Sequence, residues 1–327
     1  EKIVEQLKTI EKLNVLVIGD AIVDQYFYCE SMGRSLKGHI IVTKYQSDES
    51  FAGGVFATAN NVSSICRNVS MMTLLGDKDE NERFVSHHLH KNITAEYFYR
   101  TGSPTTVKRR YVDEANSRKL FEICYMNDTP ITTDKEKEIT SYLKQNIEKY
   151  DLVIVSDFGH GLLIGDMIDT ICSRSKFLAI NVQTNSANAG FNLVSKYPRA
   201  DYVSIDEPEI RLAAHEKNLD LKDVMSTITD KYDYKHLIVT RGPKGSVYYS
   251  KNKGFQEAPA LASKIIDTVG AGDAYFAYTA PFMAVNAPSD LVSFIGNAVG
   301  ALAVQIVCNR EAVNQVDVLK FINRLLK

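Results

Sequence analysis

The sequence is short of cysteine, of proline and of surplus charge. Its five cysteines are odd in number and form no C-x-x-C pair, which excludes a disulfide framework and a zinc knuckle. A net charge of −2 gives no electrostatic reason to expect nucleic acid or another polyanion as a partner. Eight prolines and 18 glycines are spread along 327 residues, so no linker rich in them divides the chain. We therefore expect a reduced, cytoplasmic protein that binds a small polar molecule.

We also expect no membrane segment and no export signal. The one membrane-like run, Leu291–Cys308, is interrupted by polar and small residues, so we expect a buried helix and no membrane partner. At the N-terminus, Glu1–Lys12 predicts a short charged helix instead of a basic segment followed by an apolar one. The start at Glu1 without methionine indicates a piece of a longer polypeptide, in which another domain could be present.

The order of apolar runs predicts the fold class. With 45% hydrophobic residues, the chain can bury one large core or two modest ones. Short β-rich runs alternate with segments of helical length, which is typical of a doubly wound parallel sheet between two layers of helices. The predicted strands are Val15–Gly19, Ser70–Leu75, Asp151–Ser156, Phe177–Val182, Tyr202–Ile205 and His236–Thr240. The predicted helices are Val55–Cys66, Glu80–Lys91, Thr133–Lys149, Glu207–Lys217, Leu221–Lys231 and Val316–Leu326.

Two stretches break this alternation. Gln25–Tyr45 and Glu96–Tyr125 are rich in residues that favour strands and hairpins, and they predict a small β-sheet lid outside the main sheet. The alternative is that they are only long surface connections. No internal repeat is present, so we predict a single domain over 1–327, with a core sheet that begins at about residue 14 and lid segments at about 25–45 and 96–125.

The most informative segment is D-T-V-G-A-G-D, at positions 267–273. It places two glycines and a carboxylate where the end of a short extended stretch, Ser263–Ile266, turns into an apolar helix over Ala274–Phe282. Glycines at such a corner let backbone N–H groups approach an anion at the positive end of the helix. The segment therefore predicts a phosphate site at the start of a helix.

The last residue of this segment suggests catalysis. Asp273 would stand in the first helical turn, beside the anion, where a carboxylate can take a proton from an attacking hydroxyl group. We expect the amides of Gly270, Ala271 and Gly272 to stabilise the transferred charge. The alternative is a glycine-rich helix start in which Asp273 is only a capping or first-turn residue.

The string D-T-V-G-A-G-D resembles the signature of the ribokinase or PfkB family of carbohydrate kinases, and the resemblance extends from about Asn14 to the end of the chain. It implies a ribokinase-like fold with a lid, and transfer of a phosphoryl group from ATP to a hydroxyl group of a sugar or sugar phosphate, with Mg²⁺. It also implies that Asp273 is the catalytic base and that the lids pair in a homodimer. A monovalent-cation site near Asp267 and Thr268 is a further implication.

On the substrate side, polar residues and glycines follow the predicted strands, where ligands of open α/β sheets collect. Asp24 matches the family's aspartate that binds sugar hydroxyls, and a turn or cap carboxylate is the alternative. Gly53 and Gly54 resemble the family's first signature and allow a ligand to approach the backbone closely. Simple helix-start geometry would also explain these two glycines.

Two lid cations and a further aspartate complete the predicted substrate site. Lys108 and Arg110 lie two residues apart in a predicted strand, so they point to one face and could hold a substrate phosphate. A solvated basic strand is the alternative. Asp157 ends a predicted strand and resembles a residue of the heptose-phosphate kinases that could bind substrate or order the metal's water shell, or it caps the next helix.

Several positions depart from the pattern of the heptose-phosphate kinases, which the chain otherwise resembles most. Ala57 stands where a sugar-contacting asparagine is expected, and Asn181 and Gln183 replace an acidic and a basic residue, which predicts a neutral polar pocket. The acceptor could therefore be heptose 7-phosphate on the route to ADP-heptose, another sugar phosphate, a nucleoside or a fructose-type sugar. A catalytically silent sugar or nucleotide sensor is the hypothesis from a different class.

The nucleotide side is also assigned by resemblance. Glu209 matches the family glutamate that positions hydrated Mg²⁺ and the phosphates, although Asp206 and Glu209 also form a good capping pattern. The turn T-R-G-P-K-G over 240–245 resembles the family turn near the nucleotide phosphates, and Asn297 matches a position beside the adenine pocket. The residues assigned to the nucleotide are Glu209, Thr240, Arg241, Gly242, Gly245 and Asn297.

Overall fold

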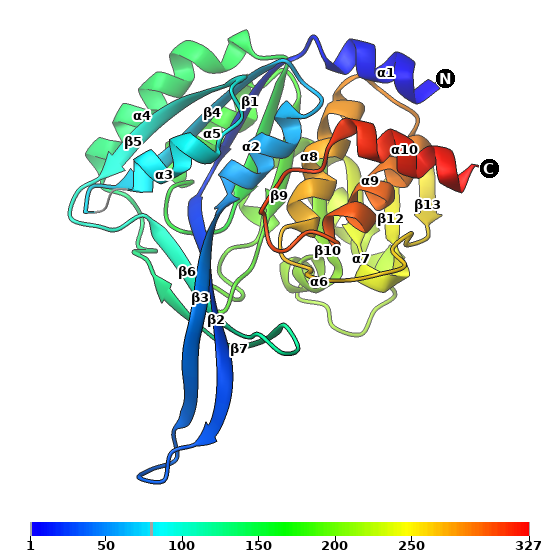
Figure 1. Cartoon of the computed structure of the whole chain (residues 1–327). Coiled ribbons are helices and arrows are strands. Elements are labelled where there is room, and N and C mark those ends of the chain that lie inside the picture. Colours follow the sequence, from blue (N-terminus) through cyan, green and yellow to red (C-terminus); the bar gives the residue numbers. More distant parts are fainter. Residues whose placement is uncertain (1, 79–80, 327) are drawn as a thin grey trace.

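The computed structural model describes residues 2–78 and 81–326. Over these residues it contains one large sheet, a second small sheet and helices on both faces of the large sheet (Figure 1). The large sheet has nine strands, in the order β13 (Gly254–Ala258), β12 (Ser246–Ser250), β11 (Asp233–Thr240), β10 (Arg199–Asp206), β9 (Leu178–Val182), β8 (Leu152–Asp157), β1 (Asn14–Gly19), β4 (Asn68–Gly76) and β5 (Ile93–Arg100).

The large sheet is mixed. The seven strands from β5 to β11 run parallel, as predicted, whereas β12 and β13 form an antiparallel extension at one edge. Each predicted strand corresponds to an observed strand, with small differences at the ends. The doubly wound α/β class is confirmed, and the expectation of a purely parallel sheet is corrected by this hairpin.

Alternating side chains of the central strands build two cores, one on each face. In β1, Val15 and Val17 pack into one core, whereas Leu16 and Ile18 pack into the other. The first face is covered by α1 (Lys2–Ile10), α2 (Val55–Ser63), α3 (Asn81–His88), α8 (Ala271–Ala284), α9 (Ser289–Ala303) and α10 (Gln315–Leu325). The second face is covered by α4 (Thr133–Asn146), α5 (Gly165–Arg174), α6 (Glu207–Ala214) and α7 (Leu221–Lys231).

Most helices were predicted, and the misses have local causes. Helix α5 was not predicted, because Ile164 makes no side-chain cap and the helix begins at a glycine with a φ of +41°. The predicted helix Thr133–Lys149 ends at Asn146 and continues as a 3₁₀ turn over Ile147–Lys149. Further 3₁₀ turns span Val194–Lys196 and Gly242–Lys244. Glu1 and Glu80, which open two of the predicted helices, lie outside the described residues.

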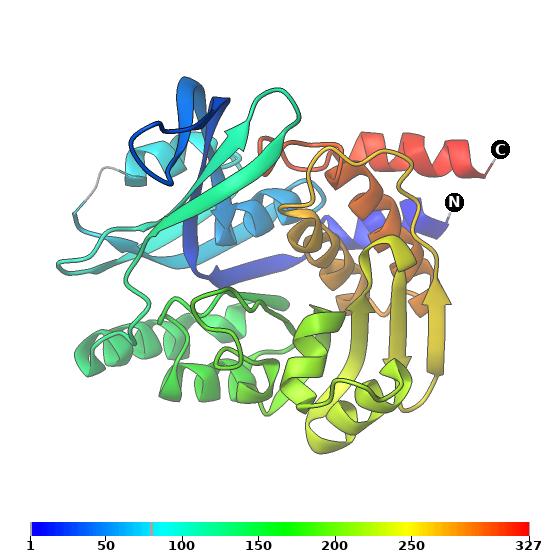
Figure 2. The same cartoon turned by 90° about the horizontal axis from the view of Figure 1, so that it is seen from below.

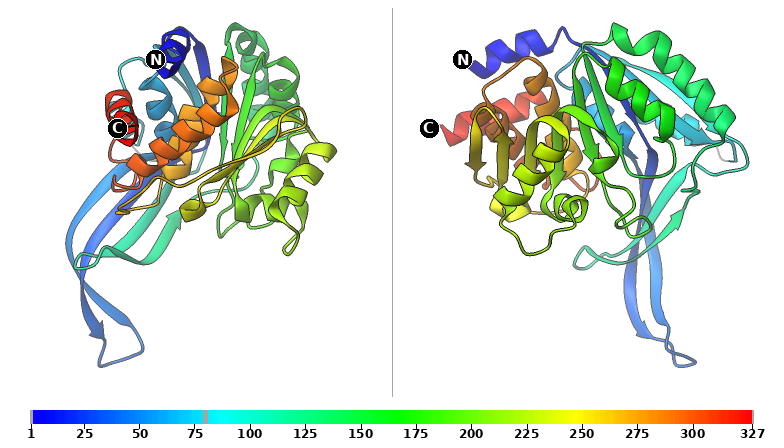
Figure 3. Two further views of the ribbon diagram at one scale, coloured as in Figure 1. Left: turned by 90° about the vertical axis from the view of Figure 1, so that its right-hand side faces the viewer. Right: turned by 180° about the vertical axis from the view of Figure 1, so that it is seen from behind.

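The second sheet is the lid, in the order β3 (Ile41–Gly54), β2 (Ala21–Arg34), β6 (Thr106–Asp113) and β7 (Arg118–Tyr125). Strands β2 and β3 pair along their whole length, and their hairpin projects away from the body of the molecule (Figure 3). The lid segments differ from the predicted 25–45 and 96–125. Residues 96–100 belong to β5, which pairs with β4 at the edge of the main sheet, and the first segment extends over 21–54.

Among the described residues, no helix has the length and apolar character that a membrane crossing requires. The run Leu291–Cys308, in which a buried helix was predicted, contains most of α9, whose inward residues are buried against α8 and the sheet.

Candidate active site

The D-T-V-G-A-G-D segment forms the start of α8. Helix α8 begins at Ala271, and its N-cap, Gly270, has a φ of 82°, a conformation that favours glycine. A Cβ atom at Gly270 would lie 2.0 Å from Asn309 Oδ1, so the corner has no room for a side chain. The predicted helix over Ala274–Phe282 is confirmed and is longer than predicted. Residues Ser263–Ile266, however, form an irregular loop and not an extended strand.

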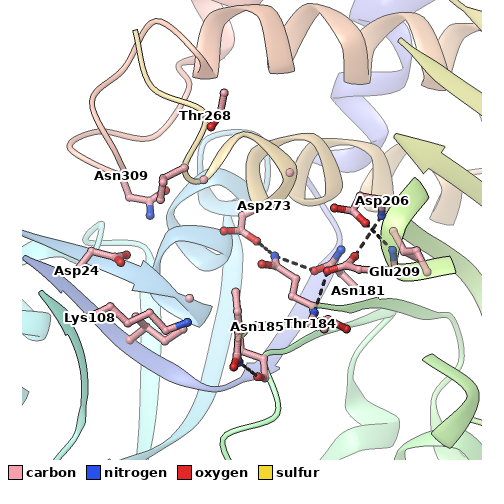
Figure 4. A pocket seen from close by; sticks show the side chains of 18 of the residues that line it. Asp24, Lys108, Asn181, Thr184, Asn185, Asp206, Glu209, Thr268, Asp273 and Asn309 are labelled. Atoms are coloured by element: carbon pink, nitrogen blue, oxygen red, sulfur yellow. Dashed lines mark hydrogen bonds between the residues drawn. The ribbon is translucent and has the colours of Figure 1, made fainter. Parts of the chain in front are cut away.

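Asp273 lies in the first turn of α8 and faces a cavity of about 340 Å³ between the lid and the carboxyl ends of the main strands (Figure 4). Open α/β sheets bind ligands at this edge. The lid contributes Ile22, Asp24, Gly54, Lys108 and Arg110. The strand ends and α6 contribute Phe158, Asn181, Gln183, Thr184, Asn185, Ser204, Ile205, Asp206, Glu209 and Thr240. The corner contributes Thr268, Val269, Gly270, Gly272 and Asp273, and Asn309 lies beside it.

The environment of Asp273 suits a general base. Its side chain is 6% exposed, and Oδ1 accepts a hydrogen bond of 2.5 Å from Gln183 Nε2. Burial raises the pKa of Asp273 to about 7, although the Gln183 hydrogen bond and the charge of Lys108 partly oppose this rise. A base with a pKa near neutral pH is effective in proton transfer, because it is partly ionised and still holds a proton firmly.

The backbone at the start of α8 offers hydrogen-bond donors. The Ala271 N–H makes a long bond of 3.3 Å to the Thr268 carbonyl oxygen, so its part in the predicted anion site is weakened. Within the described part of the chain, the N–H groups of Gly272 and Asp273 have no acceptor. A Cβ atom at Gly272 would have no neighbour within 4 Å, so this residue leaves space for a ligand. The first turn of a helix with free amides and open space suits a phosphate group.

On the substrate side, the structure places Asp24 and Gly54 in the cavity and gives Gly53 a supporting position. Asp24 is 4% exposed and accepts a 2.5 Å hydrogen bond from Arg110. A Cβ atom at Gly53 would lie 2.0 Å from Asp24 Oδ2, so this glycine makes room for the carboxylate without lining the cavity. Gly54 is the N-cap of α2, with a φ of 55°.

Lys108 and Arg110 share one face of β6, as their spacing predicted, and both line the cavity. Their charges differ in availability. Arg110 is paired with Asp24 at 2.5 Å and with Glu122 at 2.7 Å. Lys108 forms no ion pair with any residue that the structure describes and lies 5.7 Å from the centre of the Phe158 ring. Lys108 is therefore the cation that an anionic substrate group could meet.

Two substrate-side expectations are corrected. Asp157 is 1% exposed and does not line the cavity. Its carboxylate points into the interior, where it accepts a hydrogen bond of 2.6 Å from the Tyr197 hydroxyl group and forms an ion pair of 2.5 Å with Lys196. Ala57 is also buried, in α2, and does not line the cavity. Asn181 and Gln183, in contrast, line the cavity.

Glu209 is a capping residue that also lines the cavity. It forms a capping box with Asp206 at the start of α6, and Oε1 accepts a hydrogen bond of 2.9 Å from the Thr184 N–H. It also lines the cavity, where burial and the nearby charges of Asp206 and Asp273 raise its pKa to about 8. Several carboxyl groups with raised pKa values at one edge of a cavity indicate a place where a bound cation would be stabilised.

A second cavity, of about 360 Å³, lies on the other side of the α8 start and is mostly apolar. Thr240, Thr268 and Gly272 line both cavities and connect them. The second cavity is otherwise lined by Gly242, Pro243, Gly245, Ala260, Leu261, Ala262, Ile265, Ala271, Tyr275, Asn297, Gly300, Ala301 and Val304. The structure therefore brings together most of the residues that were assigned to the nucleotide.

Three of the residues that were assigned to the nucleotide also have local structural roles. Gly245 has a φ of 81°, and a Cβ atom there would lie 2.0 Å from the Ala258 carbonyl oxygen, so glycine is needed in this turn. Asn297 donates hydrogen bonds of 3.2 Å to Ser246 Oγ and to the same Ala258 oxygen. Arg241 pairs with Glu207 at 3.2 Å and lines a shallow space beside α6.

Sequence reasoning missed several of the cavity residues, among them Thr184, Asn185 and Asn309. Thr184 and Asn185 follow β9, so the rule that ligands collect beyond strand ends could have found them. Asn309 comes from the loop after α9 and reaches the corner only through the tertiary fold. No local pattern in the sequence signals this contact.

A doubly wound sheet with a β lid, and a helix start that separates a polar cavity from an apolar one, define a ribokinase-like carbohydrate kinase. The chain belongs to the pfkB family of carbohydrate kinases, whose sequence profile matches residues 12–309. This finding confirms the resemblance of the D-T-V-G-A-G-D segment and the assignment as an enzyme.

Curated relatives agree with this family. The chain is 22% identical over 315 residues to the bifunctional protein HldE of Pelobacter propionicus, which covers 94% of this chain and 64% of that protein. The HldE protein of Campylobacter jejuni strain RM1221 is 25% identical over 273 residues, which covers 83% of this chain and 56% of the relative. The chain thus spans about three fifths of the length of these relatives.

Solved structures share the fold. Ribokinase of Arabidopsis thaliana, solved with ribose and ATP, has a TM-score of 0.70 at 16% identity, with 95% of this chain and 99% of that chain covered. Phosphofructokinase-2 of Escherichia coli, solved with fructose-6-phosphate, has a TM-score of 0.75 at 12% identity, with 96% and 100% covered. At these identities the likeness shows the fold alone.

Proposed function

We propose that this carbohydrate kinase transfers the γ-phosphoryl group of ATP to a hydroxyl group of a sugar phosphate. The observation that carries this proposal is the position of Asp273 at the junction of a polar and an apolar cavity, next to free amides of a helix N-terminus. An acceptor in the polar cavity and a nucleotide in the apolar cavity would then meet at the start of α8.

Each part of the junction has a defined task. The apolar cavity, with Gly242, Gly245 and Asn297, receives the adenine base of ATP. Thr240 and Arg241 lie where the nucleotide phosphates pass towards α8. The free amides at Gly272 and Asp273 stabilise negative charge on the transferred group. Asp273 takes the proton of the attacking hydroxyl group.

Mg²⁺ fits this site as a partner of the nucleotide phosphates. The described residues contain no group of three or more His, Cys, Asp or Glu side chains arranged to hold a metal ion by themselves. Glu209, whose pKa burial raises to about 8, faces the cavity and would hold the ion through water. When bound, the ion neutralises charge on the phosphate oxygens.

A phosphorylated acceptor is favoured by Lys108. This lysine faces the cavity without an ionic partner in the described part of the chain, whereas the charges of Arg110 and Asp24 balance one another. The HldE relatives and the phosphofructokinase-2 neighbour, solved with a sugar phosphate, are in line with such an acceptor. Asn181 and Gln183 make the cavity wall neutral and polar, which suits sugar hydroxyl groups.

We further propose that the protein is a cytoplasmic homodimer that pairs through its lids. The lid exposes several large apolar side chains, and contact of such side chains with water is unfavourable, so a partner that covers them would be stabilising. They are Met32, Leu36, Ile40, Ile41, Tyr45, Phe121, Ile123 and Tyr125. Sedimentation of the full chain at several concentrations tests this proposal, and a monomer at every concentration would contradict it.

The kinase proposal is tested by ATP consumption against a panel of sugars, sugar phosphates and nucleosides, beside a thermal-shift screen with the same compounds. We expect ADP release with a sugar phosphate, and less or none with its dephosphorylated form. Thermal stabilisation by a sugar and by ATP without ADP release would contradict the proposal and favour the sensor instead.

A further inference from the structure

The carboxylate of Asp267, which opens the catalytic corner, is fully partnered. Its side chain is 8% exposed. Oδ1 accepts hydrogen bonds from Lys119 Nζ at 2.6 Å and from the Val269 N–H at 3.1 Å. Oδ2 accepts them from the Tyr26 hydroxyl group at 2.7 Å and from the Cys308 N–H at 3.1 Å. A carboxylate with four donors has no free lone pair for a metal ion, so the Asp267 side chain does not fit the monovalent cation that family resemblance implied.

The partners of Asp267 come from three separate parts of the fold. Lys119 is in β7 and Tyr26 is in β2, so both belong to the lid. Cys308 belongs to the loop after α9, which also places Asn309 against Gly270. Seen from below, this loop lies beside the lid (Figure 2). Asp267 therefore joins the lid and this loop to the start of α8.

A buried carboxylate requires a compensating positive charge. Burial by itself raises the pKa of Asp267, yet the hydrogen bonds from Lys119 and Tyr26 hold this pKa below its usual range. Among the described residues, Lys119 is the ion-pair partner of Asp267. Its ammonium group also lies 5.5 Å from the centre of the Tyr26 ring. The counter-charge of the corner is thus a side chain of the lid.

We propose that the ammonium group of Lys119 takes the place of a monovalent metal ion at the catalytic corner, so that this chain orders residues 267–273 without K⁺. The link to phosphoryl transfer rests on the proposed function, whereas the charge replacement itself does not. A lysine ammonium is a compact charge of the same sign and magnitude as K⁺, and it has three donors for nearby oxygens. Because the lysine is part of the lid, the corner receives its counter-charge only when the lid lies against it.

Thermal melting of the full chain in KCl and in choline chloride of equal ionic strength tests the replacement without any assay of activity. The wild-type protein is expected to melt at the same temperature in both salts. Lys119→Ala removes the ammonium group and leaves a buried carboxylate with space beside it. We expect this variant to melt about 2 °C or more higher in about 100 mM KCl than in choline, because K⁺ then binds the folded state.

Three further variants define the cause of a salt effect. Lys119→Arg keeps the charge and is expected to show no preference for KCl. Lys119→Ala combined with Asp267→Asn removes both charges and should lose the preference again. Lys222→Ala removes a lysine from an exposed pair with Glu257, of similar length at 2.7 Å, and should show no preference either. If Lys119→Ala does not fold, Lys119→Gln retains most of the side chain and takes its place.

Two results would overturn the proposal. One is a wild-type protein that K⁺ stabilises more than choline does. The other is a folded Lys119→Ala or Lys119→Gln variant that melts at the same temperature in both salts. Where turnover is measurable, the wild-type rate should be equal in both salts and the variant rate should rise with KCl. An enzyme without turnover on any acceptor would refute the proposed function, and the melting data would still decide the role of Lys119.

Discussion

The two cavities that meet at the start of α8 are lined by different kinds of groups. The apolar cavity is formed mainly by backbone turns and small side chains, such as Gly245 and Gly300, whose positions follow from the main fold. The polar cavity is formed by charged and amide side chains that come partly from the lid, such as Asp24 and Lys108. The departures from the heptose-kinase pattern that line a cavity, Asn181 and Gln183, are both on the polar side.

This difference suggests a division of labour. A cavity made of backbone suits a ligand that does not change, whereas a cavity made of side chains can be altered one residue at a time. The nucleotide side would then be fixed by the fold, and the acceptor side would set substrate choice. Substitutions on the two sides should therefore affect different kinetic constants, and substitutions at the corner between them should affect turnover itself.

The largest of these substitution effects is expected at the corner, for Gly270→Val. A β-branched residue is strained at a φ of 82°, and its Cβ atom would collide with Asn309. The resulting shift of the helix start should lower kcat by about 10² or more. Gly254→Val is the matched control, because Gly254 has a φ of 70° and no neighbour within 4 Å of its added Cβ. Equal loss of turnover in both variants would refute this explanation.

The next largest effect is expected in the polar cavity, where Lys108 is the cation without an ion pair among the described residues. Lys108→Ala should raise KM for a phosphorylated acceptor by about 10-fold to 100-fold, because a charge-assisted hydrogen bond is lost. KM for ATP should not change. Arg109→Ala is the control, since Arg109 is adjacent in sequence but packs over the Phe27 ring outside the cavity. An unchanged KM for the acceptor in Lys108→Ala would remove Lys108 from the phosphate site.

The pH dependence should reveal the raised pKa of Asp273, about 7. The protonated carboxyl group cannot accept a proton, so kcat/KM for the acceptor should fall about tenfold per pH unit below pH 7 and level off above about pH 8. A pH-independent profile between pH 5 and 8 would contradict the assignment.

Ionisation of Asp273 also changes the stability of the fold, but in the opposite direction: activity rises with pH, whereas stability falls. A buried carboxyl group with a raised pKa stabilises the folded state at pH values below about 4, and this contribution is lost as the pH rises through about 7. Asp273→Asn stays neutral at every pH. Its melting temperature relative to the wild type should therefore be higher at pH 8 than at pH 4.

The smallest effect is expected at the outer nucleotide side. Arg241 is partly exposed and already paired with Glu207, so Arg241→Ala should raise KM for ATP only about threefold to tenfold. KM for the acceptor should not change. Arg174→Ala removes an arginine that lines none of the cavities described and serves as control. A larger effect on the acceptor than on ATP would contradict the assignment of the two sides.

Much of this site follows from local sequence. The glycines and Asp273 define the helix start by their conformations and spacing, and the two-residue period of β6 places Lys108 and Arg110 on one face. The sequence could not reveal which partners the tertiary fold supplies. Asp157 is withdrawn from the cavity by Tyr197 and Lys196, and Lys119 reaches Asp267 across 148 positions.

The predicted boundary of the lid was wrong for a related reason. The tyrosine-rich stretch of β5 has the composition of a lid strand, yet it pairs with β4 at the edge of the main sheet. Composition does not distinguish two half-exposed strands in different sheets. Pairing between distant strands decides their place, and this depends on the whole fold.

The most direct test of the central claim is the Asp273→Asn variant, in which turnover and nucleotide affinity are measured on the same sample. An asparagine of the same shape can still accept the hydrogen bond from Gln183, so the corner should keep its structure. We predict that kcat falls by at least about 10² while the Kd of a non-hydrolysable ATP analogue changes by less than about twofold. Undiminished turnover with the same affinity would show that Asp273 is not the base.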